Sequence, residues 1–482
     1  MWIFSIITDD VYITMDFINT TGNTVYIEDI DLHVLYNEAV QQIDEINLLR
    51  SKSFQQMVLL NGFKIVHAGN TRIEQNLLRM QKGMAKLKQF GKMNKTTPLI
   101  EENVSTKVDK QVVIKGHFLD AGGYAKVNRN LALGLSTAGI DVKIDIIANK
   151  NQLDESETRQ INKMIGKGTQ NAVYIDSVIP SFGTMKSRKN SILYTTIESY
   201  SVTDQFLELA NRYKEVWVTS DFCKEMLEGA GLKRPIFVLP DSIDINIYTE
   251  KGDKYRFKPE LKKFVFLSVF GWSYRKGYDT LLKSYIKEFS GDDDVTLLLV
   301  TRFQNESKRT DIVLKEVNKY IKESGKKNPP HIVRCHKVIP ESIMPSIYRA
   351  CDAFVLPSRG EGFGLPYCEA SLCGLPVIAT NCSGQKMFLK HNNSYLIEPD
   401  ELVKISPGMM HIHYWDEQKF PALMSTKVIK DCGKKMREVY KNYNKALKRN
   451  KKLQKFIMSN YSIGHVATKA INKLNKIWDG EK

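Results

Sequence analysis

Between residue 111 and about residue 400, short apolar runs alternate with segments in which apolar residues recur every three or four positions. The short runs have the length of buried strands, and the recurring spacing is that of helices with one buried face. Strands that alternate with helices predict parallel sheets covered by helices. The predicted strands lie at residues 112–114, 142–147, 172–175, 191–195, 215–219, 236–239, 264–269, 295–300, 331–335, 353–356 and 377–379.

A polar connector divides this pattern into two units. Residues 241–263 hold Gly252 and Pro259, and the alternation restarts immediately after them. We therefore expect two doubly wound α/β domains, at residues 111–245 and 262–426. Two such domains leave a cleft between the carboxyl ends of their sheets, where open α/β sheets bind ligands.

The N-terminal extension, residues 1–110, follows a different pattern. It has short strand-like stretches at residues 11–13 and 24–27, and a helical region from about 38 to 90. The polar stretch at residues 92–110 is typical of a linker. The pattern assigns no chemistry to this extension.

The C-terminal segment, residues 427–482, is mostly helical and carries most of the excess charge. The whole chain has a net charge of +16, and this segment has 16 basic and 4 acidic residues, a net charge of +12. Residues 441–455 hold seven basic residues and no acidic one. They form either a solvated helix face or a contact with an anionic membrane surface. Nucleic acid is disfavoured because few aromatic residues are interleaved.

Composition limits the classes of protein that fit the chain. An apolar share of 42% excludes wholesale disorder. No stretch approaches the roughly 18 uninterrupted apolar residues of a membrane span, and residues 1–8 lack the basic start of a secretory signal. The seven cysteines show no C-x-x-C spacing, which favours buried thiols. We expect a cytoplasmic protein.

The sharpest motif is a strand, a glycine-rich loop and a helix around Gly360, Gly362 and Gly364. Glycines let backbone amides approach a ligand closely. Pro366 suits a first helical turn, whose free N–H groups bind phosphate or sugar oxygens. A dinucleotide-binding fingerprint is disfavoured because Leu365 stands where its third glycine belongs.

Glu361 and Glu369 are separated by seven residues, and Gly-Glu-Gly-Phe-Gly-Leu-Pro stands at the start of this spacing. The segment resembles the Glu-x(7)-Glu signature of the group 1 glycosyltransferases, a retaining family with two Rossmann-like domains in the GT-B fold. Residues 345–352 resemble the family's helix before the signature, and residues 374–380 its strand after it. The resemblance spans roughly residues 111–475. It implies the GT-B fold, with a C-terminal helix that crosses back onto the first domain.

The resemblance also implies roles for residues of the second domain. Glu369 accepts hydrogen bonds from the ribose hydroxyls of the donor, and Glu361 approaches the donor sugar. The backbone amides of Phe363, Gly364 and Leu365 face the sugar and the phosphates. A carboxylate suits a vicinal diol because its two oxygens accept from two adjacent O–H groups.

In a second group of residues, after the strand predicted at 264–269, the resemblance implies cationic side chains that bind the diphosphate of the donor. Lys276, before Gly277, matches the family's lysine. The family's usual arginine lies five residues earlier, where this chain has Gly271, so Arg275 is expected to substitute for it.

In the first domain, the resemblance implies a glycine loop at Gly122 and Gly123 that lets the acceptor and the diphosphate come close. Glu198 stands near the place where many members carry a histidine that contacts the transferred sugar. The C-terminal stripe of apolar residues is expected to pack on residues 111–262, with the basic run 441–455 outside that contact. The stripe consists of Ile463, Val466, Ala467, Ala470, Ile471, Leu474 and Ile477.

The expected function is transfer of a sugar from a nucleotide diphosphate-sugar donor to a hydroxyl of a glycan, lipid or protein acceptor, with retention of anomeric configuration. No cofactor is expected. No metal site is expected either, because Asp292-Asp293-Asp294 follows Gly291 in a turn before a strand and the histidines lack ligand spacing. The alternative is a catalytically inactive GT-B-like binding module that acts through its basic tail.

Overall fold

The computed structural model describes residues 110–120, 122–147, 153, 155–179, 191–258, 260–302, 310–335, 339–405 and 418–480, together with five strands in the N-terminal extension. These strands are β1 (Trp2–Thr8), β2 (Val11–Asn19), β3 (Val25–Ile27), β4 (Leu32–Val34) and β5 (Phe63–Ala68). They form an antiparallel sheet in the order β1-β2-β5 and an antiparallel pair, β3-β4.

Two of these strands, β2 and β3, coincide with the stretches predicted at residues 11–13 and 24–27. The helical prediction for residues 38–90 is wrong at β5, where aromatic and β-branched residues favour a strand. The rest of that region and residues 92–109 of the predicted linker lie outside the described residues.

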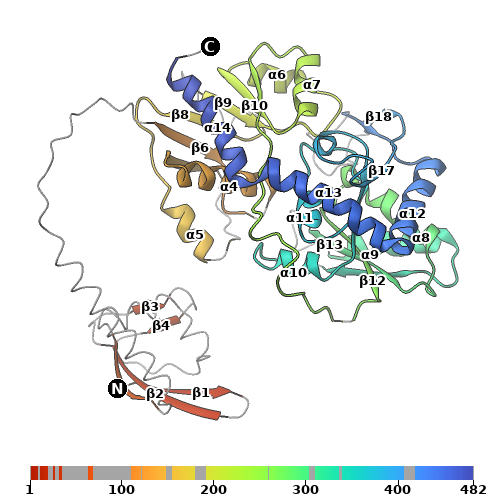
Figure 1. Ribbon diagram of the computed structural model, residues 1–482, viewed down its shortest axis with the longest axis horizontal. Coiled ribbons are helices and arrows are strands. Elements are labelled where there is room, and N and C mark those ends of the chain that lie inside the picture. Colours follow the sequence, from red (N-terminus) through yellow and green to blue (C-terminus); the bar gives the residue numbers. More distant parts are fainter. Residues whose placement is uncertain are drawn as a thin grey trace, which may run out of the picture. The chain divides into compact units, whose positions relative to one another are not determined.

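The first parallel sheet has six strands in the order β11-β10-β9-β8-β6-β7, of which Figure 1 labels β6, β8, β9 and β10. All six lie at predicted positions, because each contains a short apolar run or, in β7, alternating apolar residues that face the core. They are β6 (Gln111–Gly116), β7 (Asp141–Ile146), β8 (Val173–Ser177), β9 (Ser191–Thr195), β10 (Glu215–Val218) and β11 (Ile236–Val238). The helices of this part are α4 (Gly123–Thr137), α5 (Glu155–Asn162), α6 (Asp204–Ala210) and α7 (Asp221–Gly229).

The second parallel sheet has the order β14-β13-β12-β15-β16-β17, so the chain starts in the middle, runs to one edge and returns to the other. This is the strand order of a Rossmann-like sheet. Its strands are β12 (Phe264–Gly271), β13 (Val295–Arg302), β14 (His331–Cys335), β15 (Ala353–Leu356), β16 (Val377–Thr380) and β17 (Tyr395–Ile397). The hairpin β18 (Leu402–Lys404) and β19 (Lys419–Pro421) follows.

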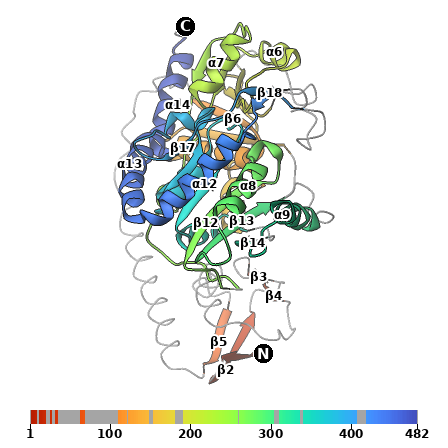
Figure 2. The ribbon, with the colours of Figure 1, turned by 90° about the vertical axis from the view of Figure 1, so that its right-hand side faces the viewer.

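Helices accompany the second sheet in the alternation that the apolar pattern predicts. They are α8 (Tyr278–Glu288), α9 (Thr310–Ser324), α10 (Met344–Arg349) and α11 (Leu365–Leu372), with short 3-10 turns η2 (Tyr274–Lys276) and η4 (Gly384–Met387). Figure 2 shows α8 beside α12 (Thr426–Lys441), the first helix of the C-terminal segment. The expected architecture of two doubly wound α/β domains is confirmed.

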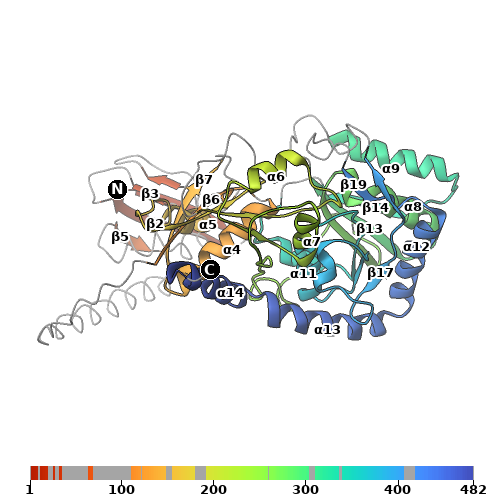
Figure 3. The same cartoon turned by 90° about the horizontal axis from the view of Figure 1, so that it is seen from above.

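The last two helices link the second domain to the first. Helix α13 (Tyr443–Tyr461) packs on α11, and α14 (Ile463–Trp478) packs on α4 (Figure 3). At the crossing with α4, a Cβ built on Gly134 would lie 2.8 Å from the Cβ of Ala467. The backbone N–H of Ile243 donates to the carbonyl oxygen of Tyr461 at 2.8 Å, between the two helices. The expected crossover helix is confirmed.

The basic run 441–455 lies outside the contact between α14 and α4, as expected. It is nevertheless part of a packed helix, because Asn450 exchanges hydrogen bonds with Ser371 of α11 at 2.7 and 3.0 Å. Arg449 lies over the ring of Tyr395 at 4.2 Å. The exposed basic residues of the run are Lys441, at the end of α12, and Lys445, Lys448, Lys451, Lys452 and Lys455 of α13.

Candidate active site

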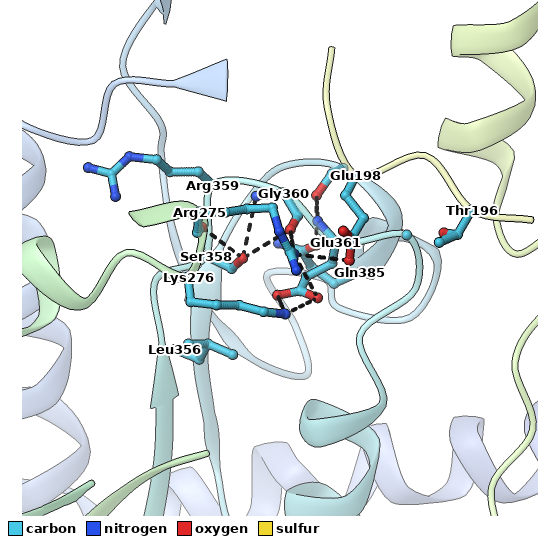
Figure 4. A network of polar contacts seen from close by, with 12 residues as sticks. Thr196, Glu198, Arg275, Lys276, Leu356, Ser358, Arg359, Gly360, Glu361 and Gln385 are labelled. Carbon is cyan, nitrogen blue, oxygen red and sulfur yellow. Dashed lines mark hydrogen bonds and ion pairs between the residues drawn. The ribbon is translucent and has the colours of Figure 1, made fainter. Parts of the chain in front are cut away.

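The loops that follow β6, β9, β12 and β15 carry the predicted site residues, so these residues lie at the carboxyl ends of strands of both sheets. Open α/β sheets bind ligands at this edge. The structure brings Glu198, Arg275, Lys276 and Glu361 together in one polar network (Figure 4). Glu369 lies in a second network with residues of α4.

Glu361 is buried and paired with two cations. The Lys276 ammonium donates to both carboxylate oxygens of Glu361 at 2.7 Å, and Arg275 Nη1 lies 3.6 Å from Oε2. Burial alone would raise the pKa of Glu361, but the charges of Lys276 and Arg275 outweigh it and hold this pKa below its ordinary value. Glu361 is therefore a carboxylate at neutral pH.

Arg275 joins the two domains at this network. Its Nη1 lies 3.1 Å from Glu198 Oε1 of the first domain and donates to the carbonyl oxygen of Gly360 at 2.5 Å. Burial raises the pKa of Glu198, against the opposing charges of Arg275 and Lys276. Burial and the neighbouring Arg275 lower the pKa of Lys276. Two carboxylates thus face two cations, and a diphosphate that binds Lys276 must compete with Glu361.

Two glycines of the loop lie against residues of the first domain. A Cβ on Gly360 would overlap the carbonyl oxygen of Glu198, and a Cβ on Gly362 would overlap Thr196 Oγ1. These two glycines therefore allow the first domain to approach the loop closely. Gly364 has a φ of 107° at the N-cap of α11, a conformation that glycine adopts without strain.

A buried ion pair, which sequence analysis did not identify, holds in place the cation turn, residues 274–276, which carries Arg275 and Lys276. Arg359 donates to both carboxylate oxygens of Asp279 at 2.7 and 2.8 Å, and neither side chain is solvent-exposed. The backbone N–H of Arg359 donates to the carbonyl oxygen of Arg275 at 2.7 Å. Its guanidinium also lies over the Tyr274 ring at 3.7 Å. The only sequence signal was an arginine directly after a buried strand.

Glu369 is also buried, and both of its oxygens have protein donors. Lys126 Nζ of α4 donates to Oε1 at 2.6 Å, and the Tyr348 hydroxyl donates to Oε2 at 2.7 Å. The resemblance assigns these oxygens to the ribose. In this structure both oxygens accept from protein donors, and one of the two donors, Lys126, belongs to the first domain.

Lys126 belongs to a larger network that sequence analysis also missed. It lies 2.8 Å from Glu341 Oε1 and donates to the Tyr248 hydroxyl at 2.7 Å, and Arg129 Nη2 lies 2.7 Å from Glu341 Oε2. Burial would lower the pKa of Lys126, but Glu369, Tyr248 and Glu341 raise it well above its ordinary value. The available signal was two basic residues, three positions apart, on an otherwise apolar helix.

The remaining predicted residues are placed as follows. Gly122 is the N-cap of α4, and its N–H donates to Asp120 Oδ1 at 2.7 Å. A Cβ on Gly123 would meet no atom within 4 Å, so open space adjoins this residue. The Phe363 ring packs against Tyr461 at 5.0 Å and is buried, and Leu365 begins α11.

The acidic residues of the Asp292–Asp294 turn have protein partners in the structure. In the Asp292–Asp294 turn, Asp293 accepts from Arg437, and Asp292 Oδ1 accepts from Asn328 Nδ2 at 2.9 Å. Across the described ranges, no group of three or more His, Cys, Asp and Glu side chains is arranged to hold a metal ion. All seven cysteines are free thiols, and six of them are buried.

The buried carboxyl group of Asp241, in the first domain, predicts a pH dependence of the free energy of unfolding. Burial raises its pKa from the ordinary 3.8 to about 7, and the Tyr194 hydroxyl donates to its Oδ1 at 3.4 Å. A raised pKa in the folded state means that wild-type stability falls as the pH rises from about 4 to about 7. Asp241→Asn should therefore raise the free energy of unfolding at pH 8 by about 2–4 kcal/mol and leave it unchanged near pH 4. Urea denaturation at both pH values measures this, and an equal effect at both would contradict it.

Comparisons with known proteins cover parts of the chain. Residues 261–407 match the family model described as glycosyl transferases group 1. Mannosylfructose-phosphate synthase of Agrobacterium fabrum is 29% identical over 162 residues, which are 32% of this chain and 35% of that protein. D-inositol 3-phosphate glycosyltransferase of Jonesia denitrificans is 33% identical over 85 residues, 17% of this chain and 20% of that protein. The chain thus matches about a third or less of the length of these relatives.

Solved structures show the same fold over a longer range. Sucrose-phosphate synthase of Thermosynechococcus elongatus has a TM-score of 0.55 at 14% identity, over 77% of this chain and 100% of that one. Anabaena HepE in complex with UDP and glucose has a TM-score of 0.53 at 15% identity, over 76% and 100%. In the described helices, no segment is both long and apolar enough to cross a membrane. The two parallel-sheet domains therefore have the GT-B fold, and residues 261–407, in the second of them, are similar to the family described as glycosyl transferases group 1.

Proposed function

We propose that the protein is a glycosyltransferase that moves a sugar from a nucleotide diphosphate-sugar to an acceptor hydroxyl, with retention of anomeric configuration and without a metal ion. The observation that carries the proposal is the buried pairing of Glu361 with Lys276 and Arg275, within the segment that matches the family. HepE, which shares the fold, has been solved with UDP and glucose. The alternative, an inactive binding module, is disfavoured because Glu361 and Glu369 are both present and buried.

In the proposed reaction, the bond between the anomeric carbon and the phosphate oxygen breaks, and the acceptor oxygen bonds to that carbon on the same face. The acceptor proton passes to the leaving phosphate. Lys276 and Arg275 neutralise the diphosphate, and Glu361 and Glu198 approach the sugar. The amides of Phe363, Gly364 and Leu365, at the start of α11, face the donor with the positive end of the helix dipole.

The first-domain loop at Gly122 and Gly123 is the proposed passage for the acceptor, since open space adjoins Gly123. Glu369 is proposed to hold the ribose. The acceptor is a glycan, a lipid or a protein, and no cofactor besides the donor substrate takes part.

A screen of UDP-, GDP- and ADP-sugars tests this function. One donor should raise the thermal midpoint, because a ligand at 100 times its Kd stabilises the folded state by about 2.7 kcal/mol. The same donor should be hydrolysed slowly, and equally well in excess EDTA, with retained configuration in the NMR spectrum of the first-formed sugar. Absence of stabilisation and hydrolysis with every donor would contradict the function. Loss of hydrolysis in EDTA, with recovery on adding Mn²⁺, would contradict metal independence.

The outer face of α13 supports a proposed location, peripheral to the cytoplasmic side of an anionic membrane. Five lysines of α13 are exposed, Lys441 at the end of α12 is exposed as well, and Phe456 and Met458 of α13 are 40% and 48% exposed. Lysines near an anionic surface contribute about 1 kcal/mol each. Exposed apolar side chains beside them can insert among the headgroups.

Vesicle sedimentation measures this membrane contact. The wild type should sediment with vesicles of phosphatidylglycerol and phosphatidylcholine, and stay in the supernatant with phosphatidylcholine alone. Changing Lys441, Lys445, Lys448 and Lys452 to glutamine should abolish sedimentation. The matched control changes the exposed Lys214, Lys233, Lys251 and Lys254 instead. Equal loss in both variants, or no sedimentation of the wild type, would show that α13 presents only a solvated face.

A further inference from the structure

Two carboxylates of the second domain share one buried lysine of the first. Lys126 Nζ lies 2.6 Å from Glu369 Oε1 and 2.8 Å from Glu341 Oε1. Glu341 is bound on its other oxygen by Arg129, at 2.7 Å. Lys126 and Arg129 lie on α4, whereas Glu341 precedes α10 and Glu369 lies on α11.

We propose that Glu341 is a positioning residue for the donor nucleotide, because it retains Lys126 when the ribose takes the place of this lysine on Glu369. The inference rests on the proposed function, since it requires a nucleotide at Glu369. Neither the Glu-x(7)-Glu spacing nor the cation turn at residues 274–276 includes Glu341 or Lys126.

The need for such a residue follows from the occupied carboxylate. A vicinal diol donates two hydrogen bonds and needs accessible oxygens on Glu369. Lys126 and the Tyr348 hydroxyl occupy these oxygens, and Glu369 is 7% exposed. Binding of the ribose therefore displaces Lys126 from Oε1.

A displaced, buried ammonium group needs another partner. An unpaired charge in the interior is strongly unfavourable, and this cost would weaken the binding of the nucleotide. Glu341 at 2.8 Å and the Tyr248 hydroxyl at 2.7 Å already bind Lys126, so its release from Glu369 leaves it paired. The contact of Glu341 with Lys126 and Arg129 also keeps α4 attached to the second domain when the ribose has bound.

A double-mutant cycle on nucleotide affinity tests the proposal. In Glu341→Gln, Glu369 is the only carboxylate left to Lys126, so the lysine competes more strongly with the ribose. The Kd for the nucleoside diphosphate of the active donor, measured by calorimetry, should rise about tenfold, which corresponds to about 1.4 kcal/mol. Lys126→Met removes the competitor, so its Kd should be at or below the wild-type value. In the Lys126→Met background, Glu341→Gln should change the Kd less than twofold.

The thermal midpoint, measured in parallel, separates positioning from structural damage. A purely structural Glu341 would lower the midpoint and leave the Kd of Glu341→Gln within twofold of the wild type, which would overturn the proposal. An equal rise in Kd with and without Lys126 would overturn it as well. Glu369→Gln is the control for the donor site. If the wild type binds no nucleoside diphosphate, or Glu369→Gln binds it as the wild type does, the donor assignment itself fails and this inference with it.

Discussion

Lys276→Ala is expected to lower the turnover number of sugar transfer by about 10²–10³-fold, with a smaller change in the Kd of the donor. Its ammonium is buried, donates to both oxygens of Glu361 at 2.7 Å, and is proposed to neutralise the charge that develops on the leaving diphosphate. Preorganised charges at such a position account for losses of about this size when they are deleted. Single-turnover kinetics with saturating donor measure the chemical step separately from binding.

The matched control for this variant is Lys287→Ala. Lys287 lies on α8, the helix that follows the cation turn, and is exposed. Its removal deletes the same charge without touching the network, so turnover should stay within twofold of the wild type. A Lys276→Ala variant with turnover equal to that of Lys287→Ala would show that Lys276 is a structural partner of Glu361 and no more.

Deleting residues 460–482 is expected to abolish transfer and to destabilise the protein by several kcal/mol, although every proposed donor ligand is retained. The deletion removes α14 and uncovers α4, and it removes Tyr461, whose ring contacts the buried Phe363 at 5.0 Å. Burial of a large apolar side chain contributes about 1.5–3 kcal/mol. The thermal midpoint and the transfer rate of the truncated protein measure the two effects.

A point variant keeps this prediction testable if the truncated protein does not fold. Leu474 is fully buried in α14, and Leu474→Ala should cost about 2–5 kcal/mol. Lys476→Ala, at an exposed position of the same helix, is the control and should change the thermal midpoint little. A truncated protein with the wild-type midpoint and full turnover would show that α14 is dispensable.

Apolar periodicity predicted the elements that are long or strongly patterned. The strands β14 and β15 begin and end at the predicted residues; β15 is a wholly apolar run, and β14 is centred on the β-branched pair Ile332 and Val333. The sixth strand of the second sheet, β17, has only three residues, which is too short a run to distinguish from a buried loop. Strand β5 was missed since the surrounding residues favoured a helix.

The site was predictable where it depends on neighbours in the chain. Glu361 and Glu369 were proposed from their resemblance to the family's Glu-x(7)-Glu signature, and Lys276 from its match to the family's lysine. Lys126, the partner of Glu369, could not be predicted, because the two residues are 243 positions apart in the sequence and only the packing of the two domains brings them together. Gly360 and Gly362 indicated in the sequence that some group approaches the backbone closely there. Which protein group approaches depends on the packing of the two domains.

The contact of Gly362 with Thr196 bears on whether the two domains separate before the proposed donor binds. No methyl group fits between the two domains at this contact, and Glu198 meets Gly360 in the same way. If a sugar is to reach Glu361, which is 4% exposed, the domains must separate there, so we expect opening to precede association of the proposed donor. The observed association rate should therefore level off with increasing donor concentration, at the rate constant of opening, and the apparent affinity is reduced by the fraction of molecules that are open.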